Sequence, residues 1–463
     1  MTRGAHFWRG KWITENAAER RLRSLAGEAS DVLGEPFPVS LVVDACAHLS
    51  ADLANSSGPV RKRLSPYLGT MTTEAAGEAL AELSRELTRE ALYEKLEREL
   101  GGPASGRFVR VSARANPFES WEPVGLLVHI LPNNAPAIGV LSVVEGLLTG
   151  NFNVAKAGSR DTAFTFAVLA ELAAKDPTGR LAQRIVGLRF PADRSDWLEL
   201  LCADADAVAV WGGDRALAGI RGFVTPGCRL IDWGAKISVG YATESHLHDE
   251  ETLDAFARMA CAPVRHACSS PQVIYAGTTD HRELMAFGER FTKVLQTVPP
   301  AASEDWLSLQ EQAEISNTIL VADHEELLSL TQVQGEAGDR RRVIVDIRPD
   351  LRASPLHRIV WVKPLPRDQI TATLRPYRRY LQTAGLAATR SEAPALVRRL
   401  ISAGVDRITR PGEMLSGYPG EPRDGVYALQ RYSRRVGVRH GGPFGEGRDL
   451  PDVGNRGRLA GDL

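Results

Sequence analysis

The stretch Gly125-Leu126-Leu127-Val128-His129-Ile130-Leu131-Pro132-Asn133-Asn134-Ala135-Pro136 begins the part of the sequence that decides the fold. Its apolar run predicts a buried strand, and a helix is predicted from Pro136 to Thr149. Asn134 is a candidate cap for that helix, and Gly150 stands where a terminating glycine belongs. The next apolar run, 152–155, predicts a second strand. Strand, helix and strand in this order are typical of a parallel sheet covered by helices.

The same alternation continues along the chain. It predicts a helix over 161–174, a strand over 185–188, a helix over 196–202 and a strand over 207–211. The fold class is therefore α/β, with a doubly wound parallel sheet and a ligand site at the carboxyl ends of its strands. Residues 16–100, before this region, are predicted to be mainly helical. Extended pieces near Val109 and Trp121 predict a projecting hairpin.

Composition narrows the function classes. The 463 residues are 43% hydrophobic and 24% charged, and the net charge of -1 gives no bulk attraction to nucleic acid or to an anionic membrane. Five scattered cysteines without a C-x-x-C pair predict neither disulfides nor a metal site. No apolar run has export or membrane-spanning character. We therefore expect a cytoplasmic protein that is not inserted in a membrane.

The loops after the predicted strands contain residues that could bind a nucleotide. Glycines ahead of a helix let backbone N–H groups approach a pyrophosphate, although a tight turn is the alternative. Lys156, at the end of a predicted strand, suits a phosphate, and the alternative is a solvated cap. Arg160 could also be a solvated residue at the start of a helix. These candidates are Pro132, Lys156, Ser159, Arg160, Gly212 and Gly213.

Cys268, in Ala267-Cys268-Ser269-Ser270-Pro271, is a candidate nucleophile. A thiolate attacks thioesters readily, and the acyl-thioester that forms keeps a carbonyl electrophilic enough to accept a hydride. The alternative is an inert core cysteine. The cluster Arg340-Arg341-Arg342 could meet phosphates of an acyl donor, or lie in a solvated loop.

Several of these pieces resemble the aldehyde dehydrogenase superfamily, in particular its acyl-CoA reductase branch, the fatty-acid reductase type of bacterial luminescence. The motifs occur in the family's order. They are Pro132-Asn133-Asn134-Ala135-Pro136, Gly150-Asn151-Phe152-Asn153-Val154-Ala155-Lys156, Gly212-Gly213, Gly234-Ala235-Lys236, Cys268 and the branch-like string from Ser416 to Tyr432.

The resemblance implies an aldehyde-dehydrogenase-like fold with two doubly wound parallel-sheet domains and a β-hairpin that builds a homodimer or homotetramer. It implies a helical layer over 1–104, the hairpin over 105–122, a dinucleotide-binding domain over 123–235 and a catalytic domain over 236–404. Residues 405–439 are expected to return to the cofactor domain, adding a strand near Val436, and 440–463 to be disordered.

The resemblance also implies a reaction. Cys268 takes the acyl group from coenzyme A or an acyl carrier protein, and the Asn134 amide holds the oxyanion, so that NADPH can reduce the acyl group to the aldehyde. NADPH is preferred to NADH, which stays possible, because no carboxylate follows Lys156. Lys156, Ser159 and Arg160 could instead surround a 2′-phosphate.

Two positions depart from the wider superfamily. Oxidising members carry a water-activating glutamate where this chain has Asp232, a candidate catalytic residue that could equally be a hydrogen-bonding residue at a strand end. His266 stands where relatives usually have glutamine, and either lowers the pKa of the thiol or packs. The alternatives are an aldehyde dehydrogenase that forms acid or acyl-CoA, and a non-catalytic subunit that binds a carrier protein.

Overall fold

The computed structural model describes residues 6–68, 73–102, 108–111, 117–132, 136–159, 163–262, 268–299, 307, 309–336 and 338–439. The chain divides into two compact units. Unit 1 combines residues from 1–69, 80–233 and 419–463, and unit 2 combines residues from 70–79 and 234–418. Unit 1 is thus built from segments that lie far apart in the sequence.

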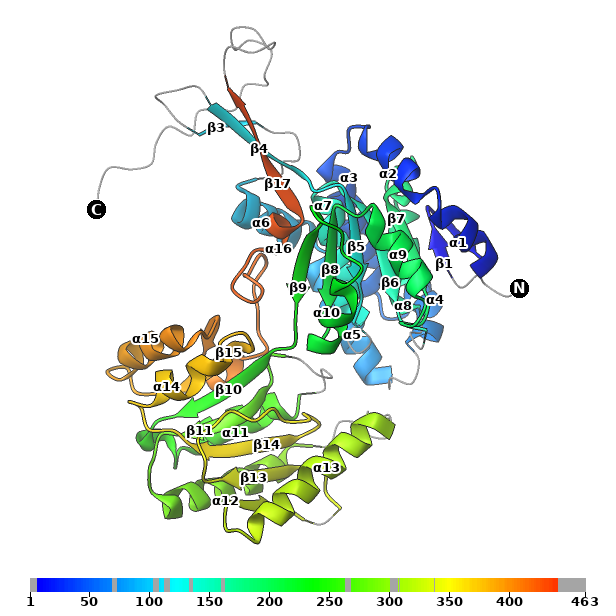
Figure 1. Ribbon diagram of the computed structural model, residues 1–463. Helices are drawn as coiled ribbons and strands as arrows, with labels where there is room; N and C mark the ends of the chain where they lie inside the picture. The colour runs from blue at the N-terminus through cyan, green and yellow to red at the C-terminus, as the bar shows by residue number, and fades with distance from the viewer. Residues whose placement is uncertain are drawn as a thin grey trace. The chain divides into compact units, whose positions relative to one another are not determined.

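Unit 1 contains a seven-stranded sheet (Figure 1). Its order is β2-β1-β7-β6-β5-β8-β9, in which the five strands from β7 to β9 are parallel and β1 and β2 are antiparallel. The bounds are β1 (His6–Trp8), β2 (Lys11–Ile13), β5 (Leu126–Ile130), β6 (Phe152–Ala157), β7 (Ile185–Arg189), β8 (Ala207–Trp211) and β9 (Arg229–Trp233).

Helices cover both faces of this sheet, because side chains on its central strands are buried in alternating directions. One face packs against α1 (Glu15–Leu22), α2 (Leu25–Leu33), α9 (Ser195–Ala203) and α10 (Asp214–Arg221). The other packs against α3 (Val39–Ala54), α4 (Pro59–Leu64), α5 (Thr73–Glu86), α6 (Arg89–Leu100), α7 (Pro136–Leu148) and α8 (Phe164–Ala173).

The expected helical layer over 1–104 is wrong at its beginning. Residues 6–13 form β1 and β2, which extend the sheet beside β7. Phe7 and Trp8 are buried there, and a turn at Arg9 and Gly10, with φ of 46° and 90°, reverses the chain. Three-residue strands are too short to show the alternation from which strands are predicted.

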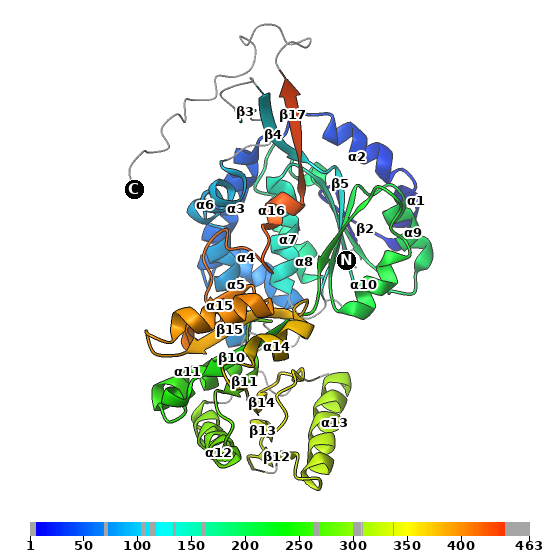
Figure 2. The same cartoon turned by 60° about the vertical axis from the view of Figure 1, so that its left-hand side comes forward.

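The expected hairpin is present and has a third strand. β3 (Val109–Arg110) pairs with β4 (Pro117–Pro123), which pairs along its whole length with β17 (Ser433–Arg439), all antiparallel. Both views show this ribbon projecting from the rest of unit 1 (Figures 1 and 2). The strand predicted near Val436 is therefore confirmed.

Unit 2 contains the second seven-stranded sheet, in the order β12-β13-β14-β11-β10-β15-β16. All neighbours are parallel except β12 and β13. The bounds are β10 (Ile237–Ala242), β11 (Pro271–Ala276), β12 (Thr331–Gln334), β13 (Arg342–Asp346), β14 (Ile359–Pro364), β15 (Leu381–Ala387) and β16 (Arg407–Thr409).

This second sheet is also doubly wound. Helices α11 (Glu250–Ala260) and α12 (His281–Thr297) pack on one face, and α13 (Leu309–Glu326), α14 (Ile370–Leu374) and α15 (Ala393–Ala403) pack on the other. The remaining short helices are α16 (Ala428–Arg431) and the 3-10 helices η1 (Ser65–Tyr67), η2 (Ala182–Arg184), η3 (Glu244–His246), η4 (Arg375–Tyr377) and η5 (Pro411–Glu413).

The expected return to the first domain at residue 405 is wrong by more than ten residues. Unit 2 continues to Tyr418, because β16 pairs with β15 at the edge of the second sheet. The chain re-enters unit 1 at Pro419. No helix within the described ranges is long and apolar enough to cross a membrane.

A buried polar network joins the re-entering segment to the first sheet. The Tyr432 hydroxyl accepts a hydrogen bond from Trp233 Nε1 (3.0 Å) and pairs with Ser142 Oγ on α7 (3.0 Å). Ser142 Oγ also accepts from Trp211 Nε1 (3.0 Å). One tyrosine therefore connects α7 with the last residues of β8 and β9.

The network continues through His129 on β5. Its Nδ1 lies 2.8 Å from Ser142 Oγ, and its Nε2 lies 3.1 Å from Asn153 Oδ1 on β6. Next to it, the Asn151 side chain accepts from the Gly125 N–H and donates to the Tyr432 carbonyl. Because buried polar groups without partners are costly, these contacts fix the register of the strands around α7.

We expect unit 1 to lose stability in mild acid, because burial lowers the pKa of His129 from 6.5 to about 4. Between those values the unfolded chain binds the proton and the folded chain does not, so stability present above pH 6.5 is lost as pH falls. The free energy of unfolding should drop by about 2 kcal/mol from pH 6.5 to pH 5 through this group. Urea denaturation at both pH values measures the drop. His129→Gln should remove this part of the dependence and leave the part due to buried His6, whose pKa burial also lowers to about 4. Equal slopes in the two proteins would contradict a neutral buried imidazole at position 129.

Candidate functional site

Three of the residues predicted to bind a nucleotide lie at one edge of the first sheet. Pro132 follows β5, Lys156 lies at the end of β6 and Gly212 follows β8, and these three strands are neighbours that run parallel. The carboxyl ends of the strands therefore bring the three residues to the same edge, as expected from the sequence. Asn134, Arg160 and His266 lie outside the described residues.

Lys156 is a buried cation at this edge of the sheet. It is 7% exposed, and its Nζ lies 5.0 Å from the centre of the Phe190 ring. Within the described part of the chain its ammonium has neither a hydrogen bond nor an ion pair. Burial lowers the pKa of Lys156. An anion at this edge would offset the cost of burial, and exposed Ser159 lies three residues further along the chain.

Gly212 and Gly213 form the turn from β8 into α10. A Cβ on Gly212 would lie 2.9 Å from the Ala216 Cβ, so that position accepts glycine alone without a shift. Gly213 is the N-cap residue of α10, and its carbonyl accepts from Ala216 and Leu217. The helix thus begins at the sheet edge, where its N–H groups suit a phosphate.

The string from Ser416 to Tyr432 brings two arginines to the ends of β8 and β9. Trp211 and Trp233 stack with ring centres 5.2 Å apart. The guanidinium of Arg423 lies 4.8 Å from the Trp211 ring, and that of Arg431 lies 4.6 Å from the Trp233 ring. Sequence reasoning did not identify these four residues, because cation–π pairs between distant segments leave no local pattern.

Asp232 precedes Trp233 on β9, and its side chain is exposed. Its backbone carbonyl accepts from Arg431 Nη1 at 2.9 Å. The carboxylate forms no hydrogen bond or ion pair with the residues that the structure describes. Both interpretations of Asp232, as a catalytic group or as a strand-end residue, stay predictions.

Cys268 lies in unit 2, in the turn that leads into β11, and is half-buried. The Cys268 carbonyl accepts a hydrogen bond from Ser238 Oγ at 2.6 Å. Ser238 Oγ in turn accepts a hydrogen bond from the Thr383 N–H at 3.1 Å. The next residue, Ser269, donates to Gln382 Oε1 at 2.9 Å. The beginnings of β10 and β15 therefore hold the turn that carries the thiol.

Ser238, Thr383 and Gln382 are functional candidates that the sequence did not reveal. Ser238 is fully buried and lies where the register of β10 shifts against both neighbours. A register shift at a buried serine depends on tertiary pairing, so no sequence pattern marks it.

The other four thiols are poorly suited to be nucleophiles. Burial raises the pKa of Cys261 to about 11 and that of Cys202 to about 12, and it also raises the pKa of Cys46 and Cys228. A raised pKa leaves little thiolate near neutral pH. Cys268 stays the predicted nucleophile.

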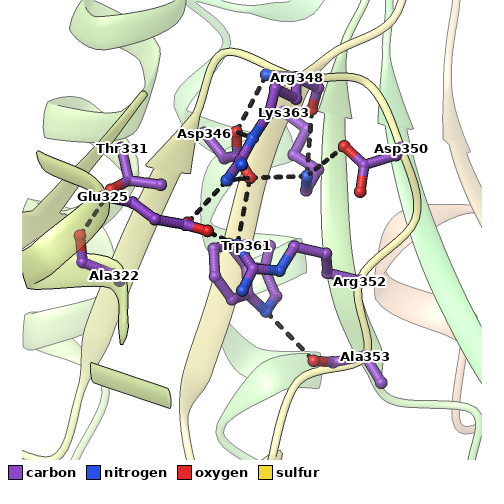
Figure 3. A network of polar contacts seen from close by, with 10 residues as sticks. All are labelled: Ala322, Glu325, Thr331, Asp346, Arg348, Asp350, Arg352, Ala353, Trp361 and Lys363. Carbon is purple, nitrogen blue, oxygen red and sulfur yellow. Dashed lines mark hydrogen bonds and ion pairs between the residues drawn. The ribbon is translucent and has the colours of Figure 1, made fainter. Parts of the chain in front are cut away.

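At the opposite edge of the second sheet, a network of charges closes the carboxyl ends of β13 and β14 (Figure 3). Asp346 and Lys363, both fully buried, are 2.9 Å apart. Arg348 pairs with Asp346 and with Glu325, and Arg352 also pairs with Glu325. Each charge in this network has an opposite partner, which is typical of a structural role.

The chain is similar to proteins of known type. The family model described as acyl-CoA reductase (LuxC) matches residues 36–435. A long-chain acyl-protein thioester reductase from Vibrio harveyi is 25% identical over 81% of this chain and 76% of its own length. A protein of the same name from Aliivibrio fischeri is 24% identical over 72% of this chain and 67% of its own.

Solved structures share the fold. A putative aldehyde dehydrogenase from Burkholderia cenocepacia has a TM-score of 0.72 at 15% identity, over 95% of this chain and 100% of its own. Glyceraldehyde-3-phosphate dehydrogenase GapN from Methanocaldococcus jannaschii, complexed with NADP, has a TM-score of 0.71 at 12% identity, over 92% of this chain and 95% of its own. The aldehyde-dehydrogenase-like fold predicted from the sequence is confirmed.

Ser238→Ala is expected to slow the reactions of Cys268, because the turn loses its anchor. The change removes a buried hydroxyl that donates to the Cys268 carbonyl and accepts from the Thr383 N–H, and each lost hydrogen bond costs about 0.5–1.5 kcal/mol. Alkylation of Cys268 by iodoacetamide, followed by peptide mass spectrometry, measures the effect. Ser50→Ala, which removes a buried serine of unit 1 that donates to the Ser84 carbonyl, is the control. An unchanged alkylation rate in Ser238→Ala would show that the anchor does not position the thiol.

Proposed function

Because this chain belongs to the acyl-CoA reductase (LuxC) family, a family of oxidoreductases, we propose that it reduces a long-chain acyl thioester to the aldehyde through a covalent acyl group on Cys268. The resemblance drawn from the sequence motifs is thereby confirmed. The observation that supports the role of Cys268 is its place at the amino end of β11, in a turn anchored by Ser238, while burial suppresses the other four thiols.

The first step is acyl transfer. The Cys268 sulfur attacks the thioester carbonyl, and the bond to the donor sulfur breaks, so that the donor leaves as a thiol. The Asn134 amide and the Cys268 N–H would donate to the oxyanion of the tetrahedral intermediate. Ser238 would act as a positioning residue, since its hydroxyl holds the Cys268 carbonyl.

Unit 1 carries the residues that fit a nicotinamide dinucleotide. Lys156, which is buried and has no ion pair among the described residues, would hold a phosphate together with the start of α10, and Gly212 would let the phosphate approach the backbone. Ser159 and Arg160 would surround a 2′-phosphate, which makes NADPH the preferred reductant over NADH. When bound, the reduced nicotinamide supplies a hydride to the acyl carbonyl.

Release follows once the carbonyl carbon is reduced. The Cys268 sulfur then leaves that carbon, and the aldehyde and the thiol are set free together. Hydrolysis of the acyl group from Cys268 would give the carboxylic acid instead of the aldehyde. The exposed side chain of Asp232, one methylene shorter than glutamate, supports reduction over the oxidising alternative.

The acyl donor that we favour is a protein thioester, because the relatives named above are acyl-protein thioester reductases. Coenzyme A is the second donor to test. The ribbon of β3, β4 and β17 supports a homodimer or homotetramer, since its outer strands have edges that another subunit can complete. A reducing cytoplasm suits a thiol nucleophile.

Incubation with decanoyl-CoA without reductant should add one decanoyl group to the wild-type protein, because no hydride is present to release it. Intact-protein mass spectrometry detects the added mass, and peptide mapping locates it. Cys268→Ala should neither gain the mass nor form aldehyde with NADPH, whereas Cys261→Ala should do both. Turnover by Cys268→Ala at a rate near that of the wild type would exclude the proposed nucleophile.

The kcat/KM for NADPH is expected to exceed that for NADH. Lys156→Ala should raise the KM for both reductants, because both carry the pyrophosphate, and Arg160→Ala should raise the KM for NADPH alone. Steady-state kinetics with a fixed acyl donor measure kcat and KM for both reductants in the wild type and in each variant. A tenfold preference for NADH in the wild type would contradict the assignment of Ser159 and Arg160.

A further inference from the structure

One segment of unit 2 carries a concentrated positive charge. Between residues 375 and 410 the chain has eight arginines and two carboxylates, Glu392 and Asp406, whereas the whole chain has a net charge of -1. An excess of six positive charges in 36 residues is a local property that the overall composition hides.

The fold brings several of these arginines together. Arg375 in η4 donates to the Ser402 carbonyl at 2.6 Å, and Gly404, at the end of α15, packs against Arg378. Arg398 lies one helical turn before Ser402, so it projects from the same side of α15. The arginine surface is defined by residues of η4, the residues that follow it, and α15: Arg375, Arg378, Arg379, Arg398 and Arg399.

This charge is not neutralised by carboxylates of the described residues. Arg375, Arg378 and Arg399 donate to backbone carbonyls, which is a structural role but leaves their charge uncompensated. Arg378, Arg379 and Arg398 are exposed. Within the described part of the chain, none of the five forms an ion pair with a carboxylate. By contrast, Arg341, from the cluster noted in the sequence, pairs with Asp339 and is occupied.

The arginine surface lies at the edge of the sheet that carries Cys268. Lys236 Nζ donates to the Arg379 carbonyl at 3.1 Å, and the Ile237 N–H donates to the Tyr380 carbonyl at 2.6 Å. β15 begins directly after these residues and is two strands from β11, about 10 Å at a spacing of about 4.8 Å. The arginine surface and the thiol therefore lie at the same, amino end of strands in one sheet.

We infer that the arginine surface docks an acidic protein that carries the acyl group as a thioester, an inference that rests on the function proposed above. Charge complementarity assigns the sign of the partner. Exposed arginines on a turn and on α15 suit an extended protein face, since sites for small ligands are concave and enclosed. Ile401, 59% exposed on α15, adds the apolar contact that arginines accompany in interfaces.

The test compares three donors of one decanoyl group: an acidic acyl carrier protein, coenzyme A and uncharged N-acetylcysteamine. Arg378→Glu with Arg379→Glu should raise the KM for the carrier protein about tenfold and weaken its dependence on salt, because steering by charge is lost. Reduction of the N-acetylcysteamine thioester should change less than twofold. Arg20→Glu with Arg23→Glu alters two exposed arginines of unit 1 by the same charge and should leave all three donors unaffected.

Direct binding separates this inference from the proposed function. Fluorescence anisotropy of the labelled carrier protein measures its affinity for the wild type, for the double variant and for Arg398→Glu, without turnover. If the wild type reduces no thioester yet binds the carrier protein through these arginines, the proposed function fails and the docking surface stands. The docking surface would be overturned by equal affinity for the carrier protein in all proteins. A rise in KM confined to coenzyme A, or a changed oligomeric state in the variants, would overturn it too.

Discussion

The hydroxyl of Tyr432 is the contact on which unit 1 most depends. It receives the indole N–H of Trp233 and meets Ser142, which in turn holds Trp211 and His129. These groups are buried, so each needs its protein partner. The carboxyl-terminal edge of the sheet therefore keeps its shape through a residue that lies some three hundred positions after β5 in the sequence.

The candidate site residues of the two sheets lie at opposite ends of their strands. In unit 1, Pro132, Lys156 and Gly212 gather at the carboxyl ends, where parallel sheets ordinarily bind ligands. In unit 2 that end is closed by the buried pair of Asp346 and Lys363, and the thiol lies at the amino end of β11. A charge network thus consolidates one edge of the second sheet while hydrogen bonds from Ser238 and Thr383 shape the other.

Much of this architecture could be predicted from the sequence, for physical reasons. Long apolar runs with clear punctuation, such as 126–131 before Pro136, identified the central strands and helices, and Gly150 indeed has the positive φ of 81° that ends α7. Cys268 and Lys156 could be singled out because their chemistry is specific to their residue types. Three-residue strands at 6–13 and the pairing of β16 were missed, since neither has a local pattern. Ser238, Arg423 and Arg431 act through distant partners, which only the folded chain reveals.

The order in which the two units appear during synthesis follows from the discontinuity of unit 1. Every strand of the second sheet has been made by Thr409, whereas the first sheet still lacks Tyr432. A growing chain on the ribosome can therefore complete its later unit while the earlier one still lacks Tyr432, the partner of the Trp233 indole and the Ser142 hydroxyl. Synthesis of residues 419–439, rather than of the first hundred residues, sets the moment at which the earlier unit becomes whole.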